Sequence, residues 1–288
     1  MANDKTHLGL HENCFKEWFA IDVIIEFIDL VAKNVASQDP MGLKEYGSFF
    51  HGKFKKYSGV LKDKHYILKV QENDYPELPA TEYLCNQLAR ELKIEVPDFY
   101  LIRFQENIDA FVCENFMQKR ESSNLIHIYH FLEPSSKKFN CEYLLKVIES
   151  KTQRRDEIER FIELTLFDAL IGNHDRHGRN LALIQSPQGF QLSPFYDNPS
   201  YLGTESDFML GACHDPRGQI YTAHSTEPKI QDYVKEWERL GYKDFVNKFR
   251  NRIELPALIK IIDESFVSSK RKEAMKKLIR RRFQELIS

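Results

Sequence analysis

The sequence predicts an α+β protein with two lobes, a small mixed β-sheet lobe followed by a larger helical C-terminal lobe. Residues 57–114 contain short apolar runs that are separated by turn residues, which is typical of β-strands. Residues 142–287 instead carry apolar side chains three and four positions apart, which is typical of amphipathic helices. We place the boundary between the lobes so that residues 1–118 form the small lobe and residues 119–288 the helical lobe.

The first expected element is a helix from about Phe15 to Val35. Acidic residues interrupt this apolar stretch at helical spacing, at Asp22, Glu26 and Asp29. A membrane span needs about 20 mostly apolar residues without such charges. We therefore expect an amphipathic helix and no membrane span. The pattern breaks at residues 38–42, which include proline and glycine.

A strand hairpin, a second helix and two more strands complete the expected small lobe. Pro76 and Pro79 indicate a loop between the hairpin and the helix, and Pro97 ends that helix. The expected elements are strands at 57–61 and 65–70, a helix at 81–92, and strands at 99–104 and 110–114.

The helical lobe is expected to contain one short hairpin, at residues 181–192. The expected helices cover residues 142–149, 156–171, 230–240, 242–252, 256–264 and 269–287. Ligands usually bind between two such lobes.

Composition and charge exclude some classes of function. The formal net charge of −2 gives no general attraction to nucleic acids or acidic membranes. The five cysteines are widely spread and form no C-x-x-C pair, so we expect neither a zinc site nor a disulfide framework. The start of the chain lacks the apolar core of a secretory signal. We expect a cytoplasmic protein, or an effector that a dedicated machine delivers into a host cell.

The densest polar cluster is the segment Gly172–Asn180, between an apolar helix and an apolar hairpin. Five ionisable residues in such a loop suggest a functional task. A solvated connector is one alternative. A metal site of His174 and His177 is another, although Gly172 and Gly178 argue against the helix that would bring the two rings together.

Phosphoryl transfer explains more of these residues at once. It requires a carboxylate that orients the acceptor hydroxyl, and oxygen ligands for a magnesium ion that bridges the phosphates. Asp175 and Asn180 have the spacing of a protein-kinase catalytic loop. Asp197 follows one hairpin later, where a second metal-binding aspartate belongs. ATP and Mg²⁺ are therefore the expected cofactors.

The segments 170–180 and 192–197 resemble the core of HipA-like serine/threonine kinases. Residues 81–97 are similar to that family's helix after the ATP-binding lysine, and residues 112–116 to its hinge. The resemblance runs from about Gly47 to the C-terminus. The chain looks like the short members of the family, which include HipT toxins and a secreted kinase. The resemblance implies a two-lobed protein-kinase-like fold.

The resemblance also implies roles for individual residues. Asp175 would be the catalytic base, and Asn180 and Asp197 would hold Mg²⁺ beside the nucleotide. Lys69 would contact the α- and β-phosphates, although a surface lysine on an edge strand remains an alternative. Glu82 would pair with Lys69, or would be a first-turn acid that the helix dipole favours.

Further nucleotide contacts are implied at the hinge and in a phosphate loop. Glu114 and Phe116 would present backbone groups to adenine. Residues 47–59 contain three glycines and three lysines, which suit phosphate. Within them, Gly52, Lys56 and Ser58 are the expected nucleotide contacts. The segment has no G-x-G-x-x-G pattern, so an exposed basic turn remains an alternative.

Self-modification is also implied by the resemblance, because family members phosphorylate a serine of their small lobe. Ser58 and Ser48 are the candidates within the loop, and Ser122 and Ser123 are alternatives farther along the chain.

The implied function is a serine/threonine protein kinase that acts as a toxin or effector on a protein substrate such as an aminoacyl-tRNA synthetase. The implied partner is a HipB-like antitoxin or a small HipS-like antitoxin, with DNA contacted only through that partner. A phosphoinositide-kinase-like lipid kinase is an alternative, because those enzymes share the D-R-H-x-x-N loop. A nucleotide-binding pseudokinase or interaction module is another. The basic segment 268–283 could also bind nucleic acid or an anionic membrane, or be a solvated helix face.

Overall fold

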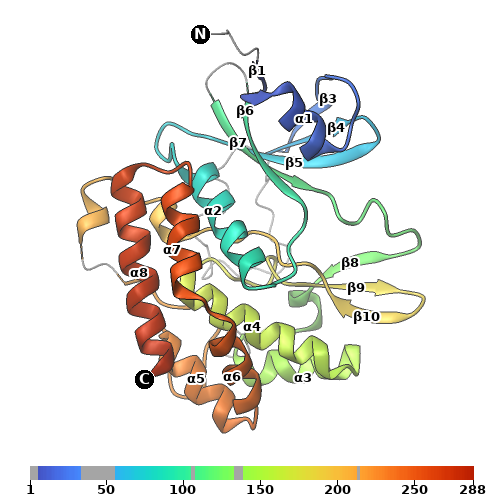
Figure 1. The fold of residues 1–288 in the computed structure, drawn as a ribbon. Helices are drawn as coiled ribbons and strands as arrows, with labels where there is room; N and C mark the ends of the chain where they lie inside the picture. Colours follow the sequence, from blue (N-terminus) through green and yellow to red (C-terminus); the bar gives the residue numbers. More distant parts are fainter. Residues whose placement is uncertain (1–5, 34–55, 105–107, 133–138, 213–214) are drawn as a thin grey trace.

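The computed structural model describes residues 6–33, 56–104, 108–132, 139–212 and 215–288. Figure 1 shows a β-sheet lobe above a larger helical lobe. The two-lobed α+β architecture predicted from the sequence is confirmed.

The small lobe is built on a five-stranded antiparallel sheet with the strand order β3-β4-β5-β7-β6. The elements of this lobe are β1 (Thr6–His7), β2 (Leu10–His11), α1 (Glu12–Phe19), β3 (Ile28–Lys33), β4 (Lys56–Leu61), β5 (Lys64–Val70), β6 (Phe99–Phe104) and β7 (Ile108–Glu114). Phe15 and Phe19 of α1 pack onto the sheet beside Tyr66 and Leu68. The predicted hairpin and the two later strands are confirmed.

The helix expected from Phe15 to Val35 is wrong. The helix α1 ends at Phe19, and Ala20 takes the left-handed conformation (φ 52°) that commonly closes a helix. The chain then enters β3, which pairs with β4. Aliphatic and β-branched residues suit a strand as well as a helix, and contact with a distant strand decided between them. Residues 34–35 lie outside the described part of the chain.

The helix α2 (Leu78–Glu91) connects the two lobes. Pro79, which was expected in the preceding loop, lies in its first turn, where the missing N–H of proline costs no hydrogen bond. The helix packs against β6 and β7 on one side and α7 (Leu255–Glu264) on the other. Figure 1 shows it between the sheet and the helical lobe. Residues on α2 are therefore held relative to both lobes.

The helical lobe is organised around α4 (Arg155–Ile171), which is buried along most of its length. Besides α7, its other helices are α3 (Cys141–Thr152), α5 (Ile230–Arg239), α6 (Lys243–Arg252) and α8 (Ser269–Ile287). The helix α4 contacts α3, α5, α6 and α8. All six helices predicted for this lobe are confirmed, with ends that shift by a few residues.

The predicted hairpin is present as β9 (Ala182–Ser186) and β10 (Gly189–Leu192). A third strand, β8 (Asn124–His127), pairs with β9 and was not predicted. It has four residues, and only its two middle residues are aliphatic, so the sequence has no clear strand pattern there.

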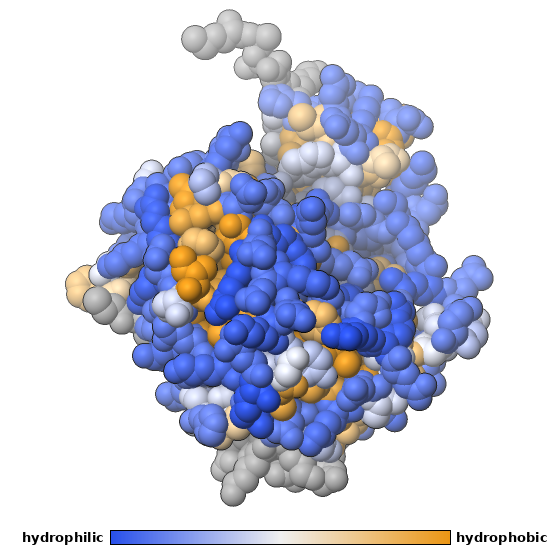
Figure 2. All heavy atoms as spheres, turned by 60° about the horizontal axis from the view of Figure 1, so that its bottom comes forward, coloured by the Kyte–Doolittle hydropathy of each residue, from blue (hydrophilic) through white to orange (hydrophobic). Residues whose placement is uncertain are grey.

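A helix that spans a membrane must be both long and apolar. In the ranges that the structure describes, no helix is long and apolar enough to cross a bilayer. Figure 2 shows one face of the molecule, which is mostly hydrophilic and carries several hydrophobic patches.

The basic side chains of α8 mainly hold neighbouring segments of the protein. Arg271 is buried and donates to the carbonyl oxygens of Leu202 and Glu205. Arg282 is also buried, and it donates to the carbonyl of Ala169 and to the carboxylate of Asp215. These contacts favour a structural role for these two arginines over a free basic face.

Candidate active site

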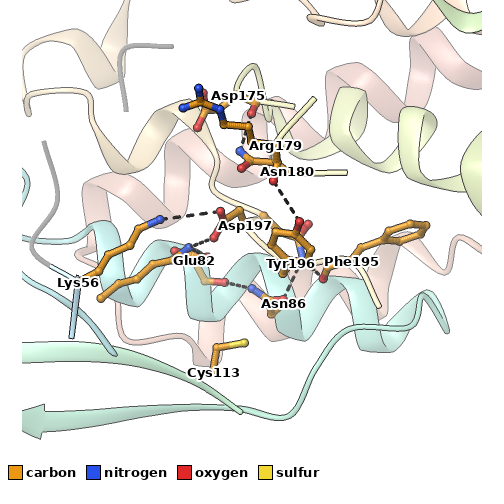
Figure 3. Close-up of polar contacts among 12 residues, drawn as sticks. Lys56, Glu82, Asn86, Cys113, Asp175, Arg179, Asn180, Phe195, Tyr196 and Asp197 are labelled. Carbon is orange, nitrogen blue, oxygen red and sulfur yellow. Dashed lines mark hydrogen bonds and ion pairs between the residues drawn. The ribbon is translucent and has the colours of Figure 1, made fainter. Parts of the chain in front are cut away.

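Two lysines of neighbouring strands point toward Asp197. Lys56 of β4 pairs with Lys69 of β5, and paired residues of antiparallel strands place their side chains on the same face. Nζ of Lys69 lies 2.5 Å from Oδ1 of Asp197 and 2.5 Å from Oε1 of Glu82 in α2. Nζ of Lys56 lies 3.9 Å from Oδ2 of Asp197. Figure 3 shows this meeting of the sheet, α2 and the loop after β10.

Burial and charge act in opposite directions on these groups. Burial alone would raise the pKa of Asp197, but Lys56, Lys69 and Arg176 outweigh it and hold the pKa well below its usual range. Burial would lower the pKa of Lys69, but Asp197 and Glu82 raise it above its usual value. Burial raises the pKa of Glu82, with Lys69 opposing and Asp197 adding to the increase. Asp197 and Lys69 are therefore both charged at neutral pH.

The loop that carries Asp175 begins where α4 ends. Gly172 has a left-handed φ of 73°, and a side chain there would overlap the ring of Tyr201. The N–H of Asp175 then donates to Oδ1 of Asn173 at 2.9 Å. Nδ2 of Asn180 donates to the carbonyl of Asp175 at 2.9 Å. Because the amide nitrogen of Asn180 is used inside the loop, its amide oxygen is the atom suited to a cation.

Arg176 is only 2% exposed and holds the loop and the Asp197 segment together. Its guanidinium donates to both carboxylate oxygens of Asp168 in α4, at 2.8 and 3.0 Å. It also donates to the carbonyl oxygens of Asn180 and Tyr196, at 2.7 and 2.8 Å. Tyr196 directly precedes Asp197. One side chain thus fixes the backbone at both residues expected to hold the metal.

A chain of buried amides continues from Arg176 to α2. Arg176 donates to Oδ1 of Asn198 at 2.6 Å, and Nδ2 of Asn198 donates to Oδ1 of Asn86 at 3.0 Å. Nδ2 of Asn86 donates to the carbonyl of Glu82 at 2.8 Å. Glu82, the partner of Lys69, is therefore linked through the hydrogen bonds of Asn86 and Asn198 to the loop that carries Asp175.

The segment expected to form the hinge lies against the loop that carries Asp197. The ring of Phe116 lies 6.0 Å from that of Tyr196, between centroids. The hydroxyl of Tyr196 donates to the carbonyl of Arg179 at 3.0 Å. The backbone N–H of Glu114 donates to the carbonyl of Asp98 at 2.8 Å, so this N–H already has a partner within the small lobe.

The structure describes only part of the expected phosphate loop. Ser48 and Gly52 lie outside the described residues. Lys56 and Ser58 lie in β4, where Ser58 pairs with Ile67 of β5. Residues 56–59 are extended because they pair with β5, as the strand predicted at 57–61 requires, and the rest of the expected phosphate loop lies outside the described residues. Alternate residues of a strand share a face, so Ser58 is on the same face as Lys56.

The donor set fits Mg²⁺. Asn180 and Asp197 provide hard oxygen atoms, and Mg²⁺ is commonly bound by one or two protein oxygens together with phosphates and water. Among the described residues, no three histidine, cysteine or acidic side chains gather in a way that would hold a metal by themselves.

Sequence reasoning missed most of the positioning residues of this site. It placed Arg176 beside Asp175 as a residue that could hold the loop, but it did not consider Asp168, Asn86 or Asn198. Asn86 carries at most a weak signal, because Gln87 beside it is also polar and the stretch from Leu84 to Leu88 does not single it out. The contacts among these residues span 112 positions of sequence, which local patterns do not reveal.

Comparison with known families places the site inside a matched region. Residues 51–240 match the family model of the HipA-like C-terminal domain. The serine/threonine-protein kinase CtkA of Helicobacter pylori is 22% identical over 204 residues, covering 66% of this chain and 61% of that protein. A Haemophilus influenzae protein provisionally named a kinase is 25% identical over 184 residues, covering 54% and 53%. The chain thus spans about half to three fifths of the length of these curated relatives.

Solved structures show the same fold. The crystal structure of the Helicobacter pylori proinflammatory kinase CtkA matches with a TM-score of 0.66 and 19% identity, covering 80% of this chain and 90% of that one. The HipA chain of a Shewanella oneidensis MR-1 complex with HipB and operator DNA matches with a TM-score of 0.54 and 16% identity, covering 83% and 61%. At these identities the likeness concerns the fold alone.

Proposed function

The chain belongs to the HipA-like C-terminal domain family, and we propose that it is an ATP- and Mg²⁺-dependent serine/threonine protein kinase. The observation that carries this proposal is the meeting of Lys69, Glu82 and Asp197 at one point, with Asp175 and Asn180 in the adjoining loop. This set combines a phosphate-binding cation, two oxygen ligands for a metal and a carboxylate base.

Each residue has a distinct task in the proposed reaction. Asn180 and Asp197 hold Mg²⁺, which would neutralise charge on the phosphates of bound ATP. Lys69, whose side chain is fixed by Glu82, contacts the α- and β-phosphates. Lys56 adds positive charge beside them. Asp175 orients the hydroxyl of the acceptor serine or threonine and takes its proton during transfer.

Adenine binding completes the proposed site. Phe116 and Tyr196 offer aromatic surface beside the hinge. Because the N–H of Glu114 already donates to Asp98, the carbonyl of Glu114 is the group better suited to the amino group of adenine. Residues 1–118 and 119–288 are the two proposed functional units. Gly52 and Ser58 remain proposed nucleotide contacts.

The proposed biological role is that of a toxin or effector kinase that acts on a component of the translation machinery. The Shewanella HipA neighbour is part of a toxin–antitoxin complex with HipB and DNA. For this chain we propose a HipB-like or small HipS-like antitoxin as partner, with DNA approached only through it. We also propose an aminoacyl-tRNA synthetase as its substrate. Its proposed location is the cytoplasm or, after delivery, a host cell.

The test is phosphate transfer from γ-labelled ATP. The purified chain with Mg²⁺ is incubated with protein extract in one reaction and with phosphoinositide vesicles in another. Label on protein serine or threonine that disappears with EDTA supports the proposal. Label only on lipid would replace it with the lipid-kinase alternative. Mg-ATP binding without transfer to either acceptor would support a pseudokinase.

A further inference from the structure

His177 lies in the catalytic loop, two residues after the proposed base. Its N–H donates to the carbonyl of Asp175 at 3.0 Å, and its carbonyl accepts from the N–H of Asn180 at 2.9 Å. The backbone of His177 is thus fixed between Asp175 and Asn180. Its imidazole Nε2 lies 4.0 Å from Oδ1 of Asp175.

The proton on the imidazole ring can be assigned from the other ring nitrogen. The backbone N–H of Arg179 donates to Nδ1 of His177 at 3.1 Å. A nitrogen that accepts a hydrogen bond carries no proton, so the proton of the neutral ring is on Nε2. The N–H donor of His177 is therefore the atom nearer to the carboxylate of Asp175.

The loop is also held from its other side. Gly178 packs so closely on Tyr129 of the 3₁₀-helix η2 (Ile128–Phe131) that a Cβ atom at Gly178 would lie 2.9 Å from that of Tyr129. The N–H of Tyr129 donates to the carbonyl of Gly178 at 3.3 Å. His177 therefore sits in a loop whose backbone is fixed on both sides, and its donor position is set before any substrate arrives.

We propose that His177 is a second catalytic group, whose Nε2–H donates a hydrogen bond to a non-bridging oxygen of the phosphoryl group during transfer. This inference rests on the proposed kinase function. The acceptor hydroxyl must lie against Asp175, so the transferred group passes beside that carboxylate and within reach of Nε2. A preorganised donor aimed at such a group stabilises charge in the transition state.

Two substitutions separate this role from a structural one. His177→Gln places an amide N–H near the position of Nε2 but loses the acceptor for Arg179. His177→Asn keeps an acceptor near Nδ1 but loses the distant donor. If His177 acts as a donor, the Gln variant should keep most of the activity. The Asn variant should lose about 10²-fold in kcat with little change in the KM for ATP, as for loss of one such donor.

Calorimetry gives a second readout that needs no turnover. ADP–Mg²⁺ should bind the wild type and both variants alike. Addition of aluminium fluoride, which mimics the transferred group, should tighten binding to the wild type and the Gln variant but not to the Asn variant.

The outcomes separate the two proposals. If the wild type is active and the Asn variant is equally active, or if both variants lose the same share of activity, His177 is not a hydrogen-bond donor in the reaction. The kinase proposal would then remain intact. A wild type that transfers phosphate to no hydroxyl would overturn both.

Discussion

The guanidinium of Arg176 and the carboxylate of Asp168 form a two-bond ion pair, at 2.8 and 3.0 Å, beside the loop that carries Asp175. Both side chains are buried. The remaining bonds of Arg176 reach the carbonyl oxygens of Asn180 and Tyr196. This buried pair therefore holds Arg176 in the position from which it aligns the residues expected to hold Mg²⁺.

Removal of one member of this pair should strongly destabilise the protein. We expect Asp168→Ala to cost about 3–5 kcal/mol in free energy of unfolding, because it leaves a buried charge without its counterion. The matched control is Asp207→Ala, since Asp207 and its partner Lys270 are both exposed and such pairs contribute about 0–1 kcal/mol. Urea denaturation followed by circular dichroism measures both. Equal stabilities of the two variants would contradict the role of the buried pair.

Substitution of Asp197 should weaken Mg-ATP binding while the protein stays folded. Asp197→Ala removes a proposed metal ligand and the partner of Lys69, and Glu82 still holds that lysine. Calorimetric titration with Mg-ATP should show a large loss of affinity, and Asp207→Ala should bind as the wild type does. Unchanged affinity in a folded Asp197→Ala protein would remove Asp197 from the metal site.

The proposed base can be tested separately from binding. Asp175→Asn keeps the shape of the side chain and removes its charge. We expect nearly normal Mg-ATP affinity and a rate of transfer lower by about 10²–10⁴-fold, the usual contribution of a general base. Single-turnover kinetics with γ-labelled ATP measures the rate. Transfer at the wild-type rate would show that the central assignment is wrong.

Self-phosphorylation is expected on a small-lobe serine, Ser58 or Ser48. Ser58 shares a strand face with Lys56, so a phosphate there, with about −1.5 to −2 charges, would compete with ATP for the two lysines. Mass spectrometry after incubation with Mg-ATP should locate the modification, and Ser58→Asp should bind ATP less tightly than Ser58→Ala. The Asp175→Asn protein is the control for self-modification. Phosphate found only outside residues 46–136 would contradict self-phosphorylation of a small-lobe serine.

Glu114, in the proposed hinge, should make the stability of the folded protein depend on pH in the acid range. Burial alone would raise the pKa of Glu114, but Lys119 and Lys64 outweigh it and lower the pKa. Because the pKa of Glu114 is lower in the folded than in the unfolded protein, its charged form stabilises the fold at a pH above the unfolded-state pKa of about 4.3. This stabilisation is lost as the pH falls through the folded-state pKa. Between about pH 5 and pH 3, the wild type should therefore lose more stability than Glu114→Gln. Parallel pH profiles of the two melting temperatures would contradict this.

Local sequence was sufficient for much of the fold. The helices of the large lobe were predicted because apolar residues three and four positions apart fit only one face of a helix. The loop of Asp175 and Asn180 was singled out because an aspartate and an asparagine at this short spacing match a protein-kinase catalytic loop, and its catalytic role stays a prediction. The family resemblance drawn from these segments is confirmed by the match over residues 51–240.

Tertiary contacts decided the rest. Residues 28–33 form a strand because β4 is available to pair with them, although their sequence suits a helix as well. The short strand β8 likewise exists through its pairing with β9.

The geometry of the candidate site also depends on residues far apart in the chain. Asn86 meets Asn198, and Lys69 meets Asp197, only after the two lobes have packed on α2. The sequence by itself determined which residues carry the proposed chemistry. The tertiary structure decided how they are held, because buried ion pairs and hydrogen bonds are selected by proximity in space, which local spacing does not encode.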